Sequence, residues 1–183
     1  QLESENRGFS YSRDSLLDMR FDQTNGMPAT NILKNLTLKE LVKILKEFGE
    51  ERYSRKIAYN IYHSGELKTT SDLKNIIRKS TPPENRTKSF SRVFQAIRIS
   101  VNRELEILEN FLNTFIDCLS SRGKIVIISY HSLEDRLVKH SFKKLNKEGS
   151  INILTKKPVI PSKEEISKNS RSRSAKLRAA EKI

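Results

Sequence analysis

The stretch KIVIISYHSLEDR, from Lys124 to Arg136, decides the fold. Its first half is a continuous run of β-branched residues, which is typical of a central parallel strand covered on both faces. Ligands of open α/β sheets bind at the carboxyl ends of such strands. The polar residues 130–136 are therefore the first candidate for a functional site.

A helix is expected to begin near Leu133, directly after this strand. Ser132 and Asp135 have capping-box spacing, and an acid in a first helical turn is also favoured by the helix dipole, so we interpret both as capping residues before catalytic ones. His131 precedes the predicted cap. With an ordinary pKa of about 6.5 it could donate to a substrate or orient it, and a structural role is almost as good an interpretation.

The region before the strand is predicted to be helical. Apolar residues recur every three or four positions from Ser91 to Leu119, which predicts one long helix. Cys118 lies beside the apolar stripe and is expected to be a small core residue. A single cysteine excludes an internal disulfide, and with three scattered histidines it makes no metal-ligand motif.

Short amphipathic helices are predicted further upstream. The first covers residues 38–48, where Thr37 and Glu40 have the spacing of a capping box. A second follows, and Thr70 is expected to cap a third. Together they predict a small helical unit over residues 27–90.

The first 35 residues show no period and predict a long ordered loop. Within it, Asp18 and Arg20 alternate with apolar neighbours, so both should emerge on one side of an extended segment. A salt-bridged loop without further role is the other interpretation. On the long helix, Gln95, Arg98 and Asn102 share a border, where they could bond a nucleotide or hold the loop.

The composition is that of a folded protein, with 36% hydrophobic and 31% charged residues among 183. No apolar run approaches the roughly 20 residues of a membrane span, so we expect a cytoplasmic protein. The 35 Lys and Arg residues exceed the 22 Asp and Glu residues, a net charge of +13. This excess favours a nucleic-acid partner and a Lys-rich solvated surface about equally.

Strands are scarce. After residue 136 only residues 151–160 and 175–183 look extended. Parallel sheets need more strands, so further strands are expected before Gln1, in agreement with a first residue that is not Met.

Six motifs together resemble the RsmH (MraW) family, in its order and spacing over the whole chain. They are Gly8-Phe9-Ser10-Tyr11, Leu17-Asp18-Met19-Arg20-Phe21-Asp22, Gly49-Glu50-Glu51-Arg52, the segment from Phe94 to Leu105, the segment from Tyr130 to Arg136, and the segment from Arg171 to Arg178.

The resemblance implies an α/β fold, the C-terminal portion of a Rossmann-like methyltransferase that depends on S-adenosylmethionine. Residues 1–26 and 91–183 would form the methyltransferase portion, and residues 27–90 an inserted helical domain that recognises substrate. Members methylate the exocyclic N4 of a cytosine in the decoding region of small-subunit rRNA.

The chain also departs from the family pattern. The family's first strand, its glycine-rich turn and two acidic cofactor contacts would all lie before Gln1, so Gln1 would be the one cofactor contact retained. Phe21, Val93 and Ser170 stand where the family usually has Met, Thr and Pro. None of these three changes removes a candidate catalytic group.

Methyl transfer to a cytosine amino group needs the acceptor nitrogen aligned and its lone pair localised. A carboxylate that accepts one amino hydrogen would help, and could take the released proton. Asp18 is the first choice for this catalytic role and His131 the second. Arg20, Arg98, Asn102 and Ser132 are expected to bind the base or its phosphate, and Phe9, Tyr11 or Tyr130 to stack on the extruded base.

The implied partner is small-subunit rRNA or the assembled small subunit, with no membrane and no metal, and a homodimer is left open. The alternative is a non-enzymatic RNA-binding or ribosome-assembly module that has lost the cofactor pocket. A DNA-binding helical domain is a weaker interpretation, because residues 38–80 lack a recognition helix rich in Arg, Asn and Gln.

Overall fold

The computed structural model describes residues 7–183 and divides into two compact units, with the boundary between Glu104 and Leu105. Each unit has its own hydrophobic core. Among the described helices, none combines the length and the hydrophobicity that a membrane span requires.

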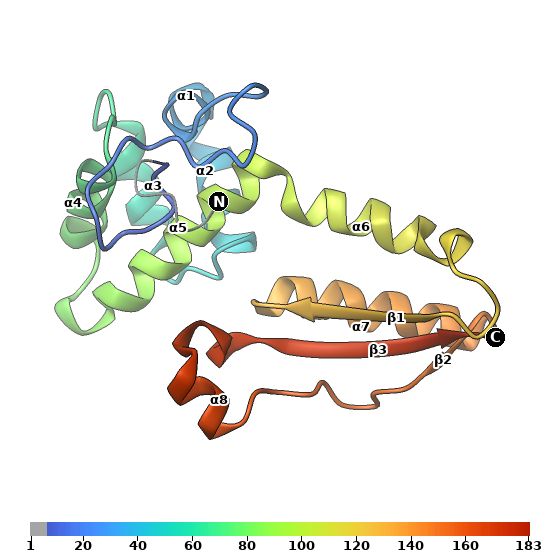
Figure 1. Ribbon diagram of the computed structural model, residues 1–183. Helices are drawn as coiled ribbons and strands as arrows, with labels where there is room; N and C mark the ends of the chain where they lie inside the picture. Colours follow the sequence, from blue (N-terminus) through green and yellow to red (C-terminus); the bar gives the residue numbers. More distant parts are fainter. Residues whose placement is uncertain (1–6) are drawn as a thin grey trace. The chain divides into compact units, whose positions relative to one another are not determined.

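The first unit is helical. It holds α1 (Ala29–Asn35), α2 (Leu38–Glu47), α3 (Ser54–Tyr62), α4 (Thr70–Ser80), a 3₁₀ turn (Pro83–Asn85) and α5 (Arg86–Asn102). These α-helices lie together in one bundle (Figure 1). Every one of them contributes buried apolar side chains to a shared core. The helices predicted within residues 27–90 are therefore present, with one helix more than the sequence pattern indicated, and α5 belongs to the same compact unit.

The extra helix is α1, which falls in the segment predicted as loop. Its N-cap, Pro28, makes no side-chain capping bond, and its first turn has no acidic residue. The usual start signals of a helix are therefore absent from the sequence. From residue 7 onward, the loop before it is ordered as predicted, because Leu17 and Met19 are buried in the core.

The caps of α2 and α4 follow capping-box geometry. Thr37 and Glu40 bond reciprocally at the start of α2, which confirms the prediction. At α4 the cap is Thr69, paired with Asp72, so the prediction of Thr70 was wrong by one residue. Thr70 is fully buried, and its hydroxyl instead donates to the carbonyl of Arg13 at 2.8 Å.

The predicted long helix is interrupted. α5 ends at Asn102, Arg103 adopts a left-handed conformation with φ 51°, and α6 (Glu104–Thr114) follows. The apolar residues continue at helical spacing on both sides of Arg103, so the end of α5 cannot be predicted from the periodicity. A left-handed residue with a side chain has no strong sequence signal.

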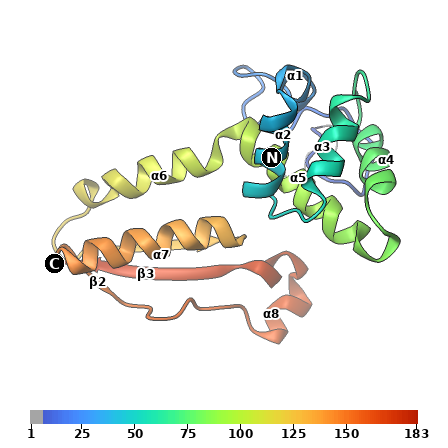
Figure 2. The ribbon, with the colours of Figure 1, turned by 180° about the vertical axis from the view of Figure 1, so that it is seen from behind.

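The second unit is a three-stranded sheet with helices. After α6 come a 3₁₀ turn (Phe115–Cys118), β1 (Lys124–Ser129), α7 (Ser132–Lys147), β2 (Ile151–Ile153), α8 (Lys163–Lys168), a second 3₁₀ turn (Ser170–Ser174) and β3 (Lys176–Lys182). The strand order is β1-β3-β2. Figures 1 and 2 show α7 lying along one face of the sheet.

β3 lies in the middle and runs antiparallel to both neighbours, with Ile127 opposite Arg178 and Ile153 opposite Ala180. The expected α/β class and both extended segments are confirmed. The expected parallel pairing of β1 is wrong for the described residues. A run of apolar residues indicates that a strand is buried, but it does not indicate the direction of the neighbouring strand.

One face of β1 is open. Ile125 and Ile127 pack in the core beneath α7, whereas Val126 and Ile128 are 57% and 52% exposed. The prediction of a strand covered on both faces is thus wrong for the described chain. Cys118 is exposed as well, not a core residue, because it lies in the 3₁₀ turn that ends the helical run.

Candidate functional site

Asp18 and Arg20 form a tight ion pair in the loop before α1. Arg20 donates from Nε to Oδ1 of Asp18 at 2.7 Å and from Nη2 to Oδ2 at 3.0 Å. The Arg20 backbone N–H and the Gln23 side chain add two further donors to the same carboxylate. Both predicted side chains therefore lie together, and the carboxylate is almost saturated with donors.

These donors hold Asp18 in its ionised form. The hydrogen bonds from Arg20 lower the pKa of Asp18, against the opposing effect of burial. Nearby Asp22 has its pKa lowered to about 2, first by the Thr24 hydroxyl and then by the Asn25 amide. A carboxylate with a lowered pKa can accept a hydrogen bond from an amino group, but it is a weak base for taking up a released proton.

Asn102 positions this loop from α5. Its Oδ1 accepts from the Phe21 backbone N–H at 2.8 Å, and its Nδ2 donates to the Met19 carbonyl at 2.7 Å. The structure thus brings Asn102 to the Asp18 and Arg20 segment, as a support for the backbone. Because the oxygen and the nitrogen of the Asn102 amide both bond the loop backbone, the amide does not point toward a nucleotide.

The loop has an unusual backbone where Asn102 holds it. Met19 has φ 61° and is fully buried, a conformation that non-glycine residues rarely adopt. Gly8, at φ 75°, lies so close that an added Cβ would come within 2.6 Å of the Leu16 carbonyl oxygen. The Met19 N–H donates to the Arg7 carbonyl at 2.7 Å, so the segment at Arg7 and Gly8 is a second support that sequence reasoning missed.

Arg98 is engaged elsewhere on α5. Its guanidinium forms a bidentate pair with Glu104, at 2.8 and 2.9 Å. Gln95 donates to the Phe48 carbonyl at 3.0 Å. Both predicted nucleotide contacts therefore have protein partners in this structure.

The aromatic residues predicted to stack on a base are also packed in part. Phe9 stacks on Phe21 with ring centroids 5.4 Å apart. Tyr11 lies against Phe90 and Phe94.

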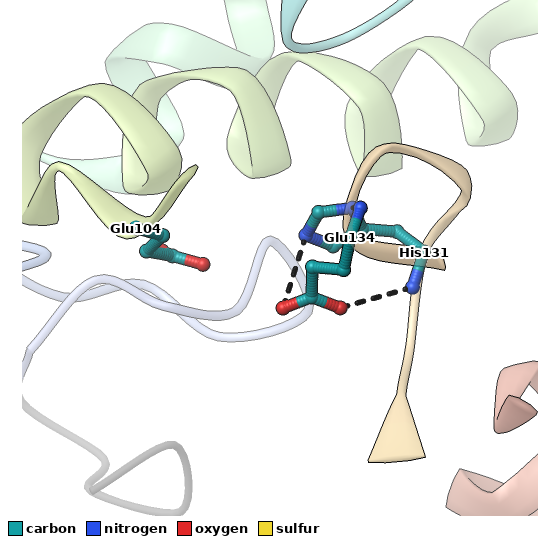
Figure 3. Close-up of side chains that lie close together, drawn as sticks. All are labelled: Glu104, His131 and Glu134. Atoms are coloured by element: carbon teal, nitrogen blue, oxygen red, sulfur yellow. Dashed lines mark hydrogen bonds and ion pairs between the residues drawn. The ribbon is translucent and has the colours of Figure 1, made fainter. Parts of the chain in front are cut away.

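The predicted site at the end of β1 has a different organisation from the one expected. His131 is the N-cap of α7, because its Nδ1 accepts from the Glu134 N–H at 3.4 Å. The Glu134 carboxylate accepts from the His131 N–H, and its other oxygen lies 3.4 Å from the His131 Nε2 (Figure 3). The His131 side chain is 8% exposed. The prediction that Ser132 caps the helix and that His131 precedes the cap was wrong.

Asp135, the other half of the predicted cap, belongs to a buried ion pair. Arg178 of β3 donates from Nε to Asp135 Oδ1 at 2.7 Å, and the side chains are 9% and 12% exposed. Burial raises the pKa of Asp135, but the bonds and charges of Arg178 and Lys176 outweigh it, so the pKa is lowered overall. Asp135 thus joins α7 to the sheet.

Tyr130, the last of the three predicted stacking residues, is exposed, and its backbone N–H donates to Glu134 at 2.9 Å. Gln1 lies outside the described residues. The catalytic and binding roles assigned to all these residues stay predictions.

S-adenosylmethionine does not fit the hollow beside α7 in the second unit. Its reactive centre is a sulfonium cation, and the hollow of the second unit is lined by lysines and an arginine, which repel a cation. The described glycines do not form a glycine-rich turn for its carboxylate or ribose.

Comparison with known proteins gives one consistent result. A model of the MraW methylase family matches residues 1–183. The protein called ribosomal RNA small subunit methyltransferase H is 46% identical in Caldicellulosiruptor saccharolyticus and 48% identical in Thermosipho africanus. Each alignment covers all of this chain and 66% and 63% of the respective relative, so the chain spans just under two thirds of their length.

Proposed function

Because the chain belongs to the MraW methylase family, we propose that it is part of an enzyme that methylates the N4 amino group of a cytosine in small-subunit rRNA, with S-adenosylmethionine as methyl donor. The observation that carries this proposal is the family match over residues 1–183, together with relatives named for methylation of small-subunit rRNA. The net charge of +13 is consistent with an RNA substrate.

On this chain, we assign Asp18 as the group that accepts a hydrogen bond from the cytosine amino group, which would take the place of the exposed Gln23 donor on Oδ2. Its carboxylate is ionised at neutral pH because Arg20 lowers its pKa. An acceptor of fixed orientation localises the nitrogen lone pair as the bond to carbon forms. Arg20 and Asn102 then act as positioning residues, since they fix the carboxylate and the backbone beside it.

The roles of His131 and Ser132 are weaker proposals. His131 has a structural task as the cap of α7, which makes it a second choice for catalysis. Ser132 remains a proposed contact for the base or its phosphate, at the first residue of α7.

The helical unit at residues 27–90 is the proposed substrate-recognition part. Tyr59 and Tyr62 on α3 are both exposed, and their rings contact His63 with centroids 4.4 and 5.2 Å apart. Exposed rings near basic side chains stack well on unpaired bases. The assignment of residues 1–26 and 91–183 to the methyltransferase portion is part of the same proposal.

The test is Asp18→Asn in a version of the protein whose rRNA methylation has been measured. The amide keeps the shape but loses the charge, so the single-turnover rate should fall by about 10² to 10⁴, with RNA affinity unchanged. Asp22→Asn is the matched control, because Asp22 is a neighbouring carboxylate with partners of its own. Equal rates for both variants would remove Asp18 from the mechanism.

The second candidate function is an RNA-binding module without methylation, which the basic charge alone would support. We expect the 183-residue chain to bind S-adenosylmethionine weakly, since Gln1 is the one residue that the family resemblance assigns to the cofactor. Calorimetry distinguishes the cases: micromolar affinity of this chain would contradict that expectation and favour the enzyme.

A further inference from the structure

The second unit has a basic hollow where the C-terminal half of α7 faces the end of β2. Its volume is about 480 Å³. The residues that line it are Lys139, Phe142, Lys143, Asn146, Asn152, Ile153, Thr155, Lys156 and Arg178. Four of these nine side chains are cationic and none is acidic.

Within residues 7–183, the three lysines of the hollow lack counter-ions. Lys139, Lys143 and Lys156 are exposed, and no acidic side chain in residues 7–183 forms an ion pair with any of them. Lys139 and Lys143 are one turn apart on α7, a spacing at which like charges repel. An anion between them would remove that repulsion.

The floor of the hollow is fixed. Arg178 is 7% exposed and held by Asp135, and the Asn146 side chain donates to the Ile151 carbonyl at 2.8 Å. Thr155 accepts from the Ala179 N–H at 2.9 Å. The lysine ammonium groups therefore stand around a rigid base, which lowers the entropic cost of binding an anion.

Two other hollows have different linings. One in the first unit, of about 560 Å³, includes Glu66 with Lys34. Another, of about 580 Å³, has Lys39 and Arg55 beside Leu38, Val42 and Tyr59. Neither of these two hollows gathers more than two cationic side chains, whereas the hollow of the second unit has four and no acidic one.

We propose that this hollow between α7 and β2 binds a backbone phosphate of RNA. A phosphodiester supplies one negative charge and oxygen acceptors that three ammonium groups can reach together. The inference rests on the proposed function in one respect, that the anionic partner is RNA. The three lysines that make the contact, on α7 and just after β2, lie outside the family motifs quoted above.

The test compares two double variants with the same change in charge. Lys139→Gln with Lys143→Gln removes two positive charges from the lining of the hollow. Lys144→Gln with Lys147→Gln removes two positive charges from the same helix outside the lining. The probe is a fluorescein-labelled stem-loop with the sequence of the rRNA decoding region. Anisotropy gives its affinity for the full 183-residue chain at several salt concentrations.

We expect the hollow variant to bind roughly 15- to 30-fold more weakly at about 0.15 M salt and to lose about 1.5 units of the logarithmic salt slope. The control pair should change both quantities much less. Thermal melting shows that both variants are folded, as expected for exposed lysines.

Three results would overturn the inference. Equal loss in both variants would mean that only net charge matters. If inorganic phosphate stabilised the wild type and not the hollow variant while RNA binding stayed equal, the hollow would hold free phosphate. A wild type that does not bind the stem-loop would overturn the inference. If, in addition, the version of the protein used to measure methylation does not methylate the stem-loop, the proposed function is overturned too. Intact methylation with no difference between the variants would leave that function standing.

Discussion

Asn102 and Met19 are joined by a hydrogen bond of 2.7 Å across 83 positions of the chain. The same amide accepts from the Phe21 N–H, so one side chain on α5 holds the backbone on both sides of Arg20. The orientation of the Asp18 and Arg20 pair therefore depends on a helix that carries no part of the pair itself.

Removing this support should loosen the loop. Asn102→Ala deletes the bonds to Met19 and Phe21, and we expect the free energy of unfolding to fall by about 1 to 3 kcal/mol. The Phe21 amide should exchange its hydrogen faster, as measured by NMR. Gln95→Ala is the control, because Gln95 also lies on α5 but bonds Phe48. Unchanged exchange at Phe21 in Asn102→Ala would contradict the role of Asn102.

The cap of α7 predicts a difference between two adjacent residues. His131→Ala should lower the free energy of unfolding by about 1 kcal/mol, because the Glu134 N–H loses its side-chain acceptor. Ser132→Ala leaves that bond in place and should cost less.

His131→Asn is the rescue variant, since asparagine is among the best N-cap residues. Its melting temperature should return toward that of the wild type. A low melting temperature in both His131 variants would show that the imidazole matters for something other than the cap.

The buried pair of Asp135 and Arg178 is suited to a double-mutant cycle. Asp135→Ala leaves the guanidinium without its main partner, and we expect a loss of about 3 to 5 kcal/mol. Replacing both residues, Asp135→Ala with Arg178→Met, should cost less than the two single losses added together. Urea unfolding of the four proteins gives the coupling energy, and strict additivity would mean that the pair does not interact in solution.

Acid should weaken the first unit through its carboxylates. The folded pKa of Asp18 lies below the unfolded value of about 3.9, so its contribution to stability is complete above about pH 4 and is lost as the pH falls through the folded pKa. Asp22 behaves in the same way, with a folded pKa of about 2.

Asp18→Asn removes one of these two titrations. Its unfolding free energy should therefore change less with pH between about pH 4 and pH 2 than that of the wild type. The measurement is urea unfolding at a series of pH values. Identical pH profiles would mean that Asp18 is not held by Arg20 in solution.

Much of this fold follows from local patterns in the sequence. The strand at Lys124–Ser129 and the capping box at Thr37 are encoded within a few neighbouring residues, so they could be predicted. The break at Arg103 could not, because its cause is one left-handed residue inside an unbroken apolar period.

The candidate site shows the same division. The juxtaposition of Asp18 and Arg20 follows from their spacing in an extended segment. The partners of Asn102 and Asp135 lie more than 40 positions away, and only the packing of helices and strands brings them together. Histidine as a helix cap was missed because its ring nitrogen is an uncommon acceptor there compared with Ser or Asp.

The open face of β1 makes protein concentration a variable in all of these experiments. In the described sheet β1 is paired on one side by β3, and Val126 and Ile128 are exposed beside that edge. An edge strand with apolar side chains can pair with the same strand of another molecule. Self-association of this kind would raise melting temperatures and bury charged side chains, and both effects would grow with protein concentration. Wild type and variants should therefore be compared at one low concentration.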